Sequence, residues 1–176
     1  MLAISFIGAA AWMLFDRREH PRLREALRTY VRFALAASMI FYGAIKVIPS
    51  QFPPPTLERL VQTYGSSSPM GLLWTFMGTS PAYTIFTGAM ELLGGLLLTA
   101  RRTMLLGALV TVGVLSNVVA LNVFYDVPVK LYSANLLAMA IYLAVPDLRR
   151  LFDFFVLRRA IEPRPDEPLL RPRRSC

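Results

Sequence analysis

A single carboxylate, Glu91, stands in the middle of an apolar segment and is the residue whose chemistry is most informative. It lies near the centre of residues 81–100, where an ionised carboxylate in a membrane is costly and rarely faces lipid. We favour a carboxylate that binds a ligand or handles a proton. The alternative is a neutral glutamic acid that hydrogen-bonds a neighbouring helix, although a glutamine would do this at lower cost. Helical spacing places small and polar residues on the same face: Thr84, Thr87, Gly88, Gly94 and Gly95.

A lysine near the end of the preceding apolar segment is the natural partner for this carboxylate. Tyr42 and Ser38 precede Lys46 at four-residue steps, so the three side chains share a helix face. Taken alone, a lysine one turn from the interface is explained by snorkelling to water. Taken together with Glu91 and the loop residue Asp126, it predicts a polar pocket in the outer half of the protein.

Two asparagines occupy the next apolar segment. Asn117 and Asn122 are about 140° apart on an ideal helix, so both cannot point into one pocket without distortion. Asn117 is the deeper of the two and is the preferred pocket residue. Asn122 is predicted to hydrogen-bond the outer cap or an adjacent helix. For both, an amide that joins two helices is the structural alternative.

The short connection after this segment carries two charges, Asp126 and Lys130. They either pair with each other as a local latch, which is the simpler account, or contribute to the pocket. The segment that follows presents a polar, aromatic and thioether face, which suits a quinone or lipid ring but is also typical of helix packing. Its members are Tyr132, Asn135, Met139 and Tyr142.

Several kinds of chemistry have no support in this sequence. The single cysteine, Cys176, is the last residue, so the chain alone forms no internal disulfide, C-x-x-C pair or thiolate cluster. The single histidine, His20, lies in a basic loop, and we assign no metal site. The net charge of +8 accompanies 55% hydrophobic residues, which excludes a small soluble nucleic-acid binder.

The apolar runs predict an all-α polytopic membrane bundle, because about 20 apolar residues cross the hydrocarbon as a helix. We expect five spans. The first run is short and precedes a basic loop; a cleaved signal ending near residues 9–11 is the alternative interpretation. The predicted spans are residues 1–15, 29–48, 81–100, 103–124 and 130–145.

Arginine placement predicts the orientation. The arginine-rich segments 16–28, 101–102 and 147–174 all fall on one side of a five-span chain. By the positive-inside rule this side is cytoplasmic, with the N-terminus outside and the C-terminus in the cytoplasm. A four-span chain without the first run keeps the same orientation.

Two further regions are not predicted to span. Residues 50–80 are expected to form an outer cap, with an amphipathic helix over 56–64 lying on the interface and a short apolar helix over 70–77. Residues 1–157 would form the transmembrane domain. Residues 158–176, rich in Pro, Arg and Glu, would form a disordered basic tail.

The sequence resembles the DoxX-like superfamily of small bacterial membrane proteins over residues 31–150. Three stretches carry the resemblance: Tyr42-Gly43-Ala44-Ile45-Lys46, Gly88-Ala89-Met90-Glu91-Leu92-Leu93-Gly94-Gly95, and Tyr125-Asp126-Val127-Pro128-Val129-Lys130. The resemblance implies a four-helix core, to which the first run is an addition. It also implies a link to thiol or sulfur redox chemistry, as a subunit of a quinone-linked oxidoreductase or a partner of secreted oxidoreductases.

These observations leave three hypotheses. The first is an accessory subunit of the bacterial inner membrane, without catalytic activity of its own, that binds a quinone or lipid in the outward-facing pocket and contacts a membrane or secreted oxidoreductase or a second copy of itself. The second is a proton-coupled small-molecule transporter that uses Glu91, although no inverted repeat is visible. The third is a quinone-linked oxidoreductase subunit, which needs a redox centre that the sequence does not supply.

Overall fold

The computed structural model describes residues 21–48 and 50–160, and in these residues every regular element is a helix. Four helices are long and apolar enough to cross a membrane, which makes the chain a membrane protein and confirms the all-α bundle with a four-helix core. Three short elements precede the second of these helices, and the last of the four, Lys130–Phe155, runs through three consecutive elements. In order, the elements are α2 (Pro21–Val47), α3 (Leu57–Val61), η1 (Tyr64–Ser66), α4 (Pro69–Thr79), α5 (Pro81–Thr99), α6 (Met104–Phe124), α7 (Lys130–Ala144), η2 (Val145–Asp147) and α8 (Leu148–Phe155).

Local sequence explains where the central helices begin. Both α4 and α5 start with a proline, whose fixed φ and missing N–H suit the first helical position. A serine precedes each proline and accepts a backbone N–H: Ser68 from Gly71 at 3.1 Å and Ser80 from Tyr83 at 3.4 Å.

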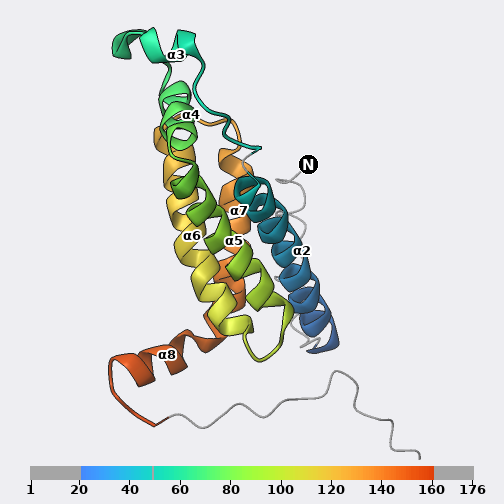
Figure 1. Cartoon of the computed structure of the whole chain (residues 1–176). Coiled ribbons are helices and arrows are strands. Elements are labelled where there is room, and N and C mark those ends of the chain that lie inside the picture. Colours follow the sequence, from blue (N-terminus) through green and yellow to red (C-terminus); the bar gives the residue numbers. More distant parts are fainter. Residues whose placement is uncertain (1–20, 49, 161–176) are drawn as a thin grey trace, which may run out of the picture.

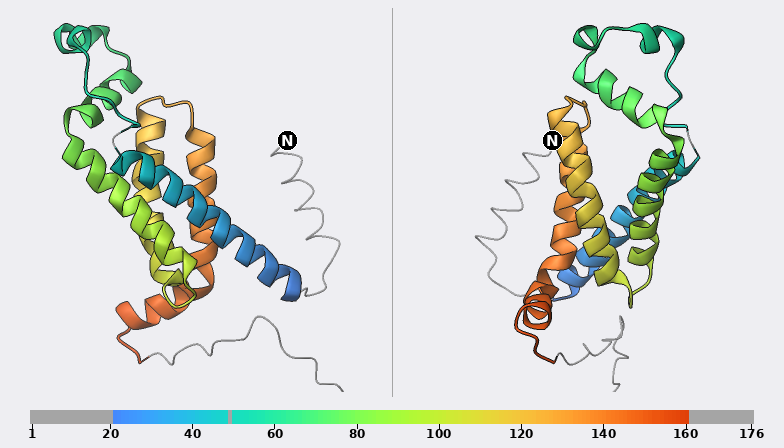
Figure 2. Two further views of the ribbon diagram at one scale, coloured as in Figure 1. Left: turned by 45° about the vertical axis from the view of Figure 1, so that its right-hand side comes forward. Right: turned by 60° about the vertical axis from the view of Figure 1, so that its left-hand side comes forward.

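The long helices follow one another around the bundle, and α2 crosses α5 along much of its length (Figures 1 and 2). Glycines permit this close approach. A Cβ on Gly88 would lie 2.8 Å from the carbonyl oxygen of Gly43, and one on Gly43 would lie 2.6 Å from the backbone nitrogen of Leu92. A core of buried apolar side chains joins all four long helices: Leu35, Ala36, Met39, Leu98, Ala108, Leu115, Leu136, Ala140, Leu143 and Ala144.

The two ends of the bundle differ in character (Figure 1). One end holds the start of α2, the α5–α6 turn with Arg101 and Arg102, and α8. The other end holds α3, α4 and the α6–α7 turn. The arginine-rich segments within the described residues therefore meet at one end, as the sequence pattern predicts.

The structure refines the predicted boundaries. The predicted span over 1–15 and most of the predicted tail lie outside the described residues. Helix α2 starts at Pro21, eight residues before the predicted span, because the arginines of the loop continue the helix. The fifth predicted span corresponds to α7 and η2, and the chain then continues into α8.

The outer cap is less regular than predicted. The expected helix over 56–64 is reduced to α3 and the turn η1, with the apolar stripe left largely exposed: Leu57 is 83% exposed and Val61 82%. Figure 1 shows α3 beyond α4, at the far end of the cap from the bundle. The predicted short apolar helix is present as α4, which buries Leu73 and Met77.

Candidate ligand-binding site

An ion pair between Lys46 of α2 and Glu91 of α5 lies at the centre of the candidate site. Lys46 Nζ donates a hydrogen bond to Glu91 Oε1, and the two side chains are only 9% and 3% exposed. The pairing follows from the close approach of α2 and α5, because the Cβ of Lys46 lies only 2.6 Å from where a Cβ on Gly88 would be. Glycine at position 88 thus leaves room for the lysine stem beside the carboxylate.

The second carboxylate oxygen has a different environment. Among the described residues, Glu91 Oε2 is buried and has no hydrogen-bond partner, and the same holds for Oε1 of Gln51. A buried acceptor without a donor costs free energy. Lys46 therefore balances the charge of Glu91 but leaves part of its hydrogen-bonding capacity unused.

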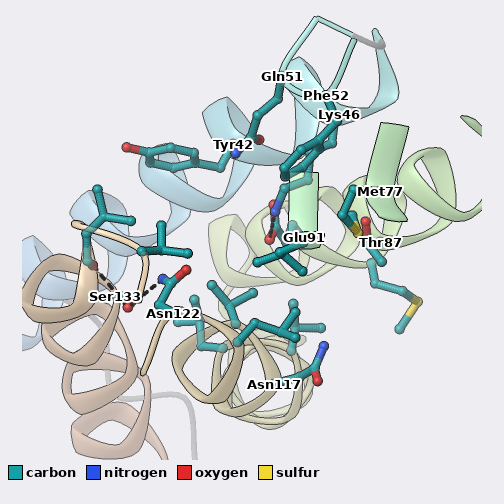
Figure 3. A pocket seen from close by; sticks show the side chains of 18 of the residues that line it. Tyr42, Lys46, Gln51, Phe52, Met77, Thr87, Glu91, Asn117, Asn122 and Ser133 are labelled. Atoms are coloured by element: carbon teal, nitrogen blue, oxygen red, sulfur yellow. Dashed lines mark hydrogen bonds and ion pairs between the residues drawn. The ribbon is translucent and has the colours of Figure 1, made fainter. Parts of the chain in front are cut away.

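A cavity of about 500 Å³ opens beside this pair, between the four long helices and the cap (Figure 3). Its wall is mainly apolar, and four of the eight methionines in the chain contribute to it. Six aromatic side chains also line it. The methionines are Met39, Met70, Met77 and Met90, and the aromatic residues are Tyr42, Phe52, Trp74, Tyr83, Phe86 and Tyr132.

The cap forms the roof of the cavity through specific contacts. The Phe52 and Trp74 rings meet edge to face with centroids 5.1 Å apart. The hydroxyl of Thr84 donates to the carbonyl oxygen of Met77 at 2.7 Å, which ties α4 to the top of α5. Gly78 lies against the chain after α2, where a Cβ would be 2.2 Å from the oxygen of Pro53.

The two asparagines of α6 both line the cavity but on different sides of the helix (Figure 3). Asn122 is buried, and its Nδ2 donates to Oγ of Ser133 on α7 at 3.0 Å, which confirms the predicted bond to an adjacent helix. Asn117 is exposed along α6 and reaches the cavity from the other side. The cavity is wide enough to meet both residues without distortion of the helix.

Three residues predicted for the pocket do not line it. Asp126 and Lys130 instead pair with each other at the surface, with side chains 77% and 41% exposed. The backbone of Asp126 has a left-handed φ of 55° and turns the chain sharply after α6. The hydrogen bond and charge of Lys130 hold the pKa of the Asp126 carboxyl below its usual range. Asn135 lies exposed on the outer face of α7.

Tyr42 and Tyr132 join α2 to α7 at the cavity wall. Their ring centroids lie 5.8 Å apart, and the Tyr132 hydroxyl is 3.4 Å from Oγ of Ser38. Of the predicted face on α7, Tyr132 lines the cavity, whereas Met139 and Tyr142 do not.

Sequence reasoning missed the residues that line the cavity from short or distant elements. Gln51 and Phe52 follow α2 without any helical period, and Ser133 lines the cavity and accepts a hydrogen bond from Asn122. The sequence signal that could have located this wall is the high proportion of methionine and aromatic residues in 70–90. Such a composition fits an adaptable apolar binding surface.

These features define a class: a small polytopic membrane protein with a ligand-sized, largely apolar cavity beside a buried ion pair. The chain belongs to the same family as a protein of Bacillus subtilis (strain 168) named uncharacterized protein YwoB. The two sequences are 33% identical over 138 residues, which cover 76% of this chain and 88% of the relative. No family model matches the chain, and no solved structure matches it.

Proposed function

We propose that this chain is a DoxX-like accessory subunit of the bacterial inner membrane that binds a quinone or a lipid-like molecule beside the Lys46–Glu91 pair. The observation that carries the proposal is the cavity of about 500 Å³ with its methionine and aromatic wall. Cavities of roughly 300–1,000 Å³ with apolar walls and few polar groups are typical of sites for small molecules. A thioether packs well against a flat ring, and Lys46 supplies a donor for a carbonyl or phosphate oxygen.

We expect this chain to bind the ligand, because the wall of the cavity is mainly apolar with few polar groups. The described residues contain no group of three or more His, Cys, Asp or Glu side chains that could hold a metal ion. A redox role would use electrons carried by a bound quinone or by a partner oxidoreductase. The chain itself would hold and orient the ligand.

The proposed orientation places the cavity towards the outer side of the membrane. The end of the bundle with Arg28, Arg101 and Arg149 would face the cytoplasm, because arginine-rich segments are retained there. The cap and the Asp126–Lys130 turn would then lie outside. Cysteine accessibility at position 126 tests this orientation, because a cysteine placed there should react with reagents added outside. Labelling only from the cytoplasmic side would show that the orientation is the reverse of the one proposed.

Native mass spectrometry of the protein extracted with its membrane lipids tests the ligand. We expect a retained quinone or lipid in the wild type and its loss in Gly113→Leu, because Gly113 lines the cavity and a Cβ there meets no atom within 4 Å. The control is Leu106→Phe, which adds bulk on α6 at an exposed position outside the cavity lining. Equal ligand occupancy in both variants and the wild type would refute binding in this cavity.

A proton-coupled transporter is the second candidate, and the unpartnered Oε2 of Glu91 is the observation that favours it. A carboxylate with a vacant acceptor beside a cavity can accept a proton from an incoming group. In proteoliposomes with an imposed pH gradient, Glu91→Gln would then abolish proton movement while ligand retention persists. Proton movement equal to that of protein-free vesicles in the wild type would exclude the transporter.

A further inference from the structure

Helix α8 presents an apolar face that no part of the described chain covers. Along Leu148–Phe155, the apolar side chains recur at positions one turn apart, and the charged residues gather on the other side. No residue of the helix is buried, and Leu148, Phe152 and Phe155 are 49%, 54% and 71% exposed. An isolated eight-residue helix is marginal in water. The face therefore needs a surface on which to bury its rings.

The position of α8 along the chain indicates that surface. The 15 residues of α7 and the 3 residues of η2 rise about 28 Å together, at about 1.5 Å per α-helical and 2.0 Å per 3₁₀ residue. The hydrocarbon core of a bilayer is about 30 Å thick. Helix α8 therefore begins at the depth where the hydrocarbon ends, and Figure 1 shows it turning sideways and projecting outward from the base of the bundle.

A charged contact fixes the point at which the chain turns into α8. Asp147, the residue before α8, is buried, and its carboxylate lies 3.6 Å from Nη2 of Arg28 on α2 and 3.5 Å from Nη1 of Arg150. The same Nη2 of Arg28 donates to the carbonyl oxygen of Leu143 at 3.3 Å. These contacts hold the start of α8 against the bundle, so α8 begins at a defined depth along the bundle axis.

The charge at this level suits an anionic surface. Arg149 is exposed on α8, and Arg101 and Arg102 lie at the neighbouring α5–α6 turn of the same end. Arginine near a membrane surface attracts anionic headgroups and binds phosphate oxygens in a bidentate manner. Amphipathic helices with basic polar faces lie in the interface with their apolar side in the acyl boundary.

We propose that α8 is an in-plane membrane anchor that inserts its phenylalanine face among the lipid chains and binds the phosphates of anionic lipids through Arg149. The occupant of this face is the bilayer that surrounds the bundle. The inference is independent of the ligand in the cavity, because α8 contributes nothing to the cavity wall.

Site-specific fluorescence in proteoliposomes tests this placement. The variant Cys176→Ser removes the single cysteine of the chain, and Phe155→Cys or Asp153→Cys then carries an environment-sensitive label. The two positions are about 160° apart on the helix, which makes them a matched pair. We expect a blue-shifted emission at position 155 that is quenched by lipids brominated on their acyl chains, and a water-like emission with little quenching at position 153.

The lipid headgroup is varied in the second arm. Adding phosphatidylglycerol to phosphatidylcholine vesicles should increase acyl-chain quenching at position 155, and Arg149→Gln should remove this increase. Equal quenching at 153 and 155 would overturn the in-plane placement. A label at 155 that neither brominated lipids nor aqueous iodide quenches would show that protein covers the face and would also overturn it. An unchanged response to phosphatidylglycerol would overturn the anionic-lipid contact.

Discussion

Replacement of Lys46 by methionine should destabilise the bundle strongly, because the variant leaves Glu91 buried without its charge partner. The Glu91 residue is 2% exposed, and its Oε2 already lacks a hydrogen-bond partner among the described residues. Removing one member of a buried ion pair costs about 3–5 kcal/mol. We therefore expect Lys46→Met to lower the free energy of unfolding by about this amount, since methionine keeps the length of the side chain but not the charge.

Replacement of Glu91 instead of Lys46 should lower the free energy of unfolding by a smaller amount. In Glu91→Met the remaining Lys46 lies at the last turn of α2, from which its ammonium can extend to water. The double variant Lys46→Met/Glu91→Met replaces both charges with apolar groups of similar volume. Such replacements are often neutral or stabilising, so the double variant should be more stable than Lys46→Met alone.

The assay is equilibrium unfolding of the purified protein in lipid–detergent micelles, followed by circular dichroism, for the wild type and the three variants. The double-mutant cycle gives the coupling energy between the two side chains, and we expect about 2–4 kcal/mol for a pair in direct contact away from water. Additive effects within about 0.5 kcal/mol would refute the reasoning, because independent sites behave in this way.

Three further variants test other parts of the structure. Gly88→Ala should lower the free energy of unfolding by about 1–3 kcal/mol, because the new Cβ would lie 2.6 Å from the Cβ of Lys46. The control is Gly113→Ala, whose Cβ would meet no atom within 4 Å. Equal unfolding midpoints for the two variants would contradict the close packing of α2 on α5. Asn122→Ala should lower the free energy of unfolding by about 1–3 kcal/mol, because it removes the buried hydrogen bond to Ser133 on α7. At the exposed position 135, Asn135→Ala should change this free energy by less than about 0.5 kcal/mol. A larger effect at 135 than at 122 would contradict a structural role for the Asn122 hydrogen bond. The ion pair of Asp126 contributes stability above the pKa of this carboxyl in the unfolded chain and loses it as the pH falls through the lower folded-state pKa. Asp126→Asn, which tolerates the left-handed backbone, should therefore flatten the acid limb of the stability profile, and an unchanged profile would show that the pair contributes nothing.

The sequence by itself determined the four long helices and the face of α5 that carries Glu91. Apolar runs of membrane-spanning length separated by arginines predict the four long helices of the described residues, because the hydrocarbon excludes unpaired backbone groups and charges. The face of Glu91 was also predictable, since i, i+3 and i+4 neighbours share one side of a helix whatever it packs against. The structure buries the predicted Thr84, Gly88 and Gly94 on this face.

Which charges pair across the bundle was only partly predictable. The sequence offered Lys46 both Glu91 and Asp126 as partners, and spacing along the chain does not decide between them. The tertiary structure decides through the glycine contact at Gly43 and Gly88, which brings α2 close enough to α5 for the lysine to reach. The left-handed turn at Asp126 directs that carboxylate to the surface and to Lys130.

The cavity itself depended entirely on tertiary structure. Its roof comes from Gln51, Phe52 and α4, which have no periodic relation to the helices below them. The hydrogen bond between Asn122 and Ser133 in its wall joins α6 to α7, and the rotation of each helix about its axis is set by packing. Sequence periodicity gives the relative directions of side chains on one helix, but the space between helices is fixed only by how several of them pack together.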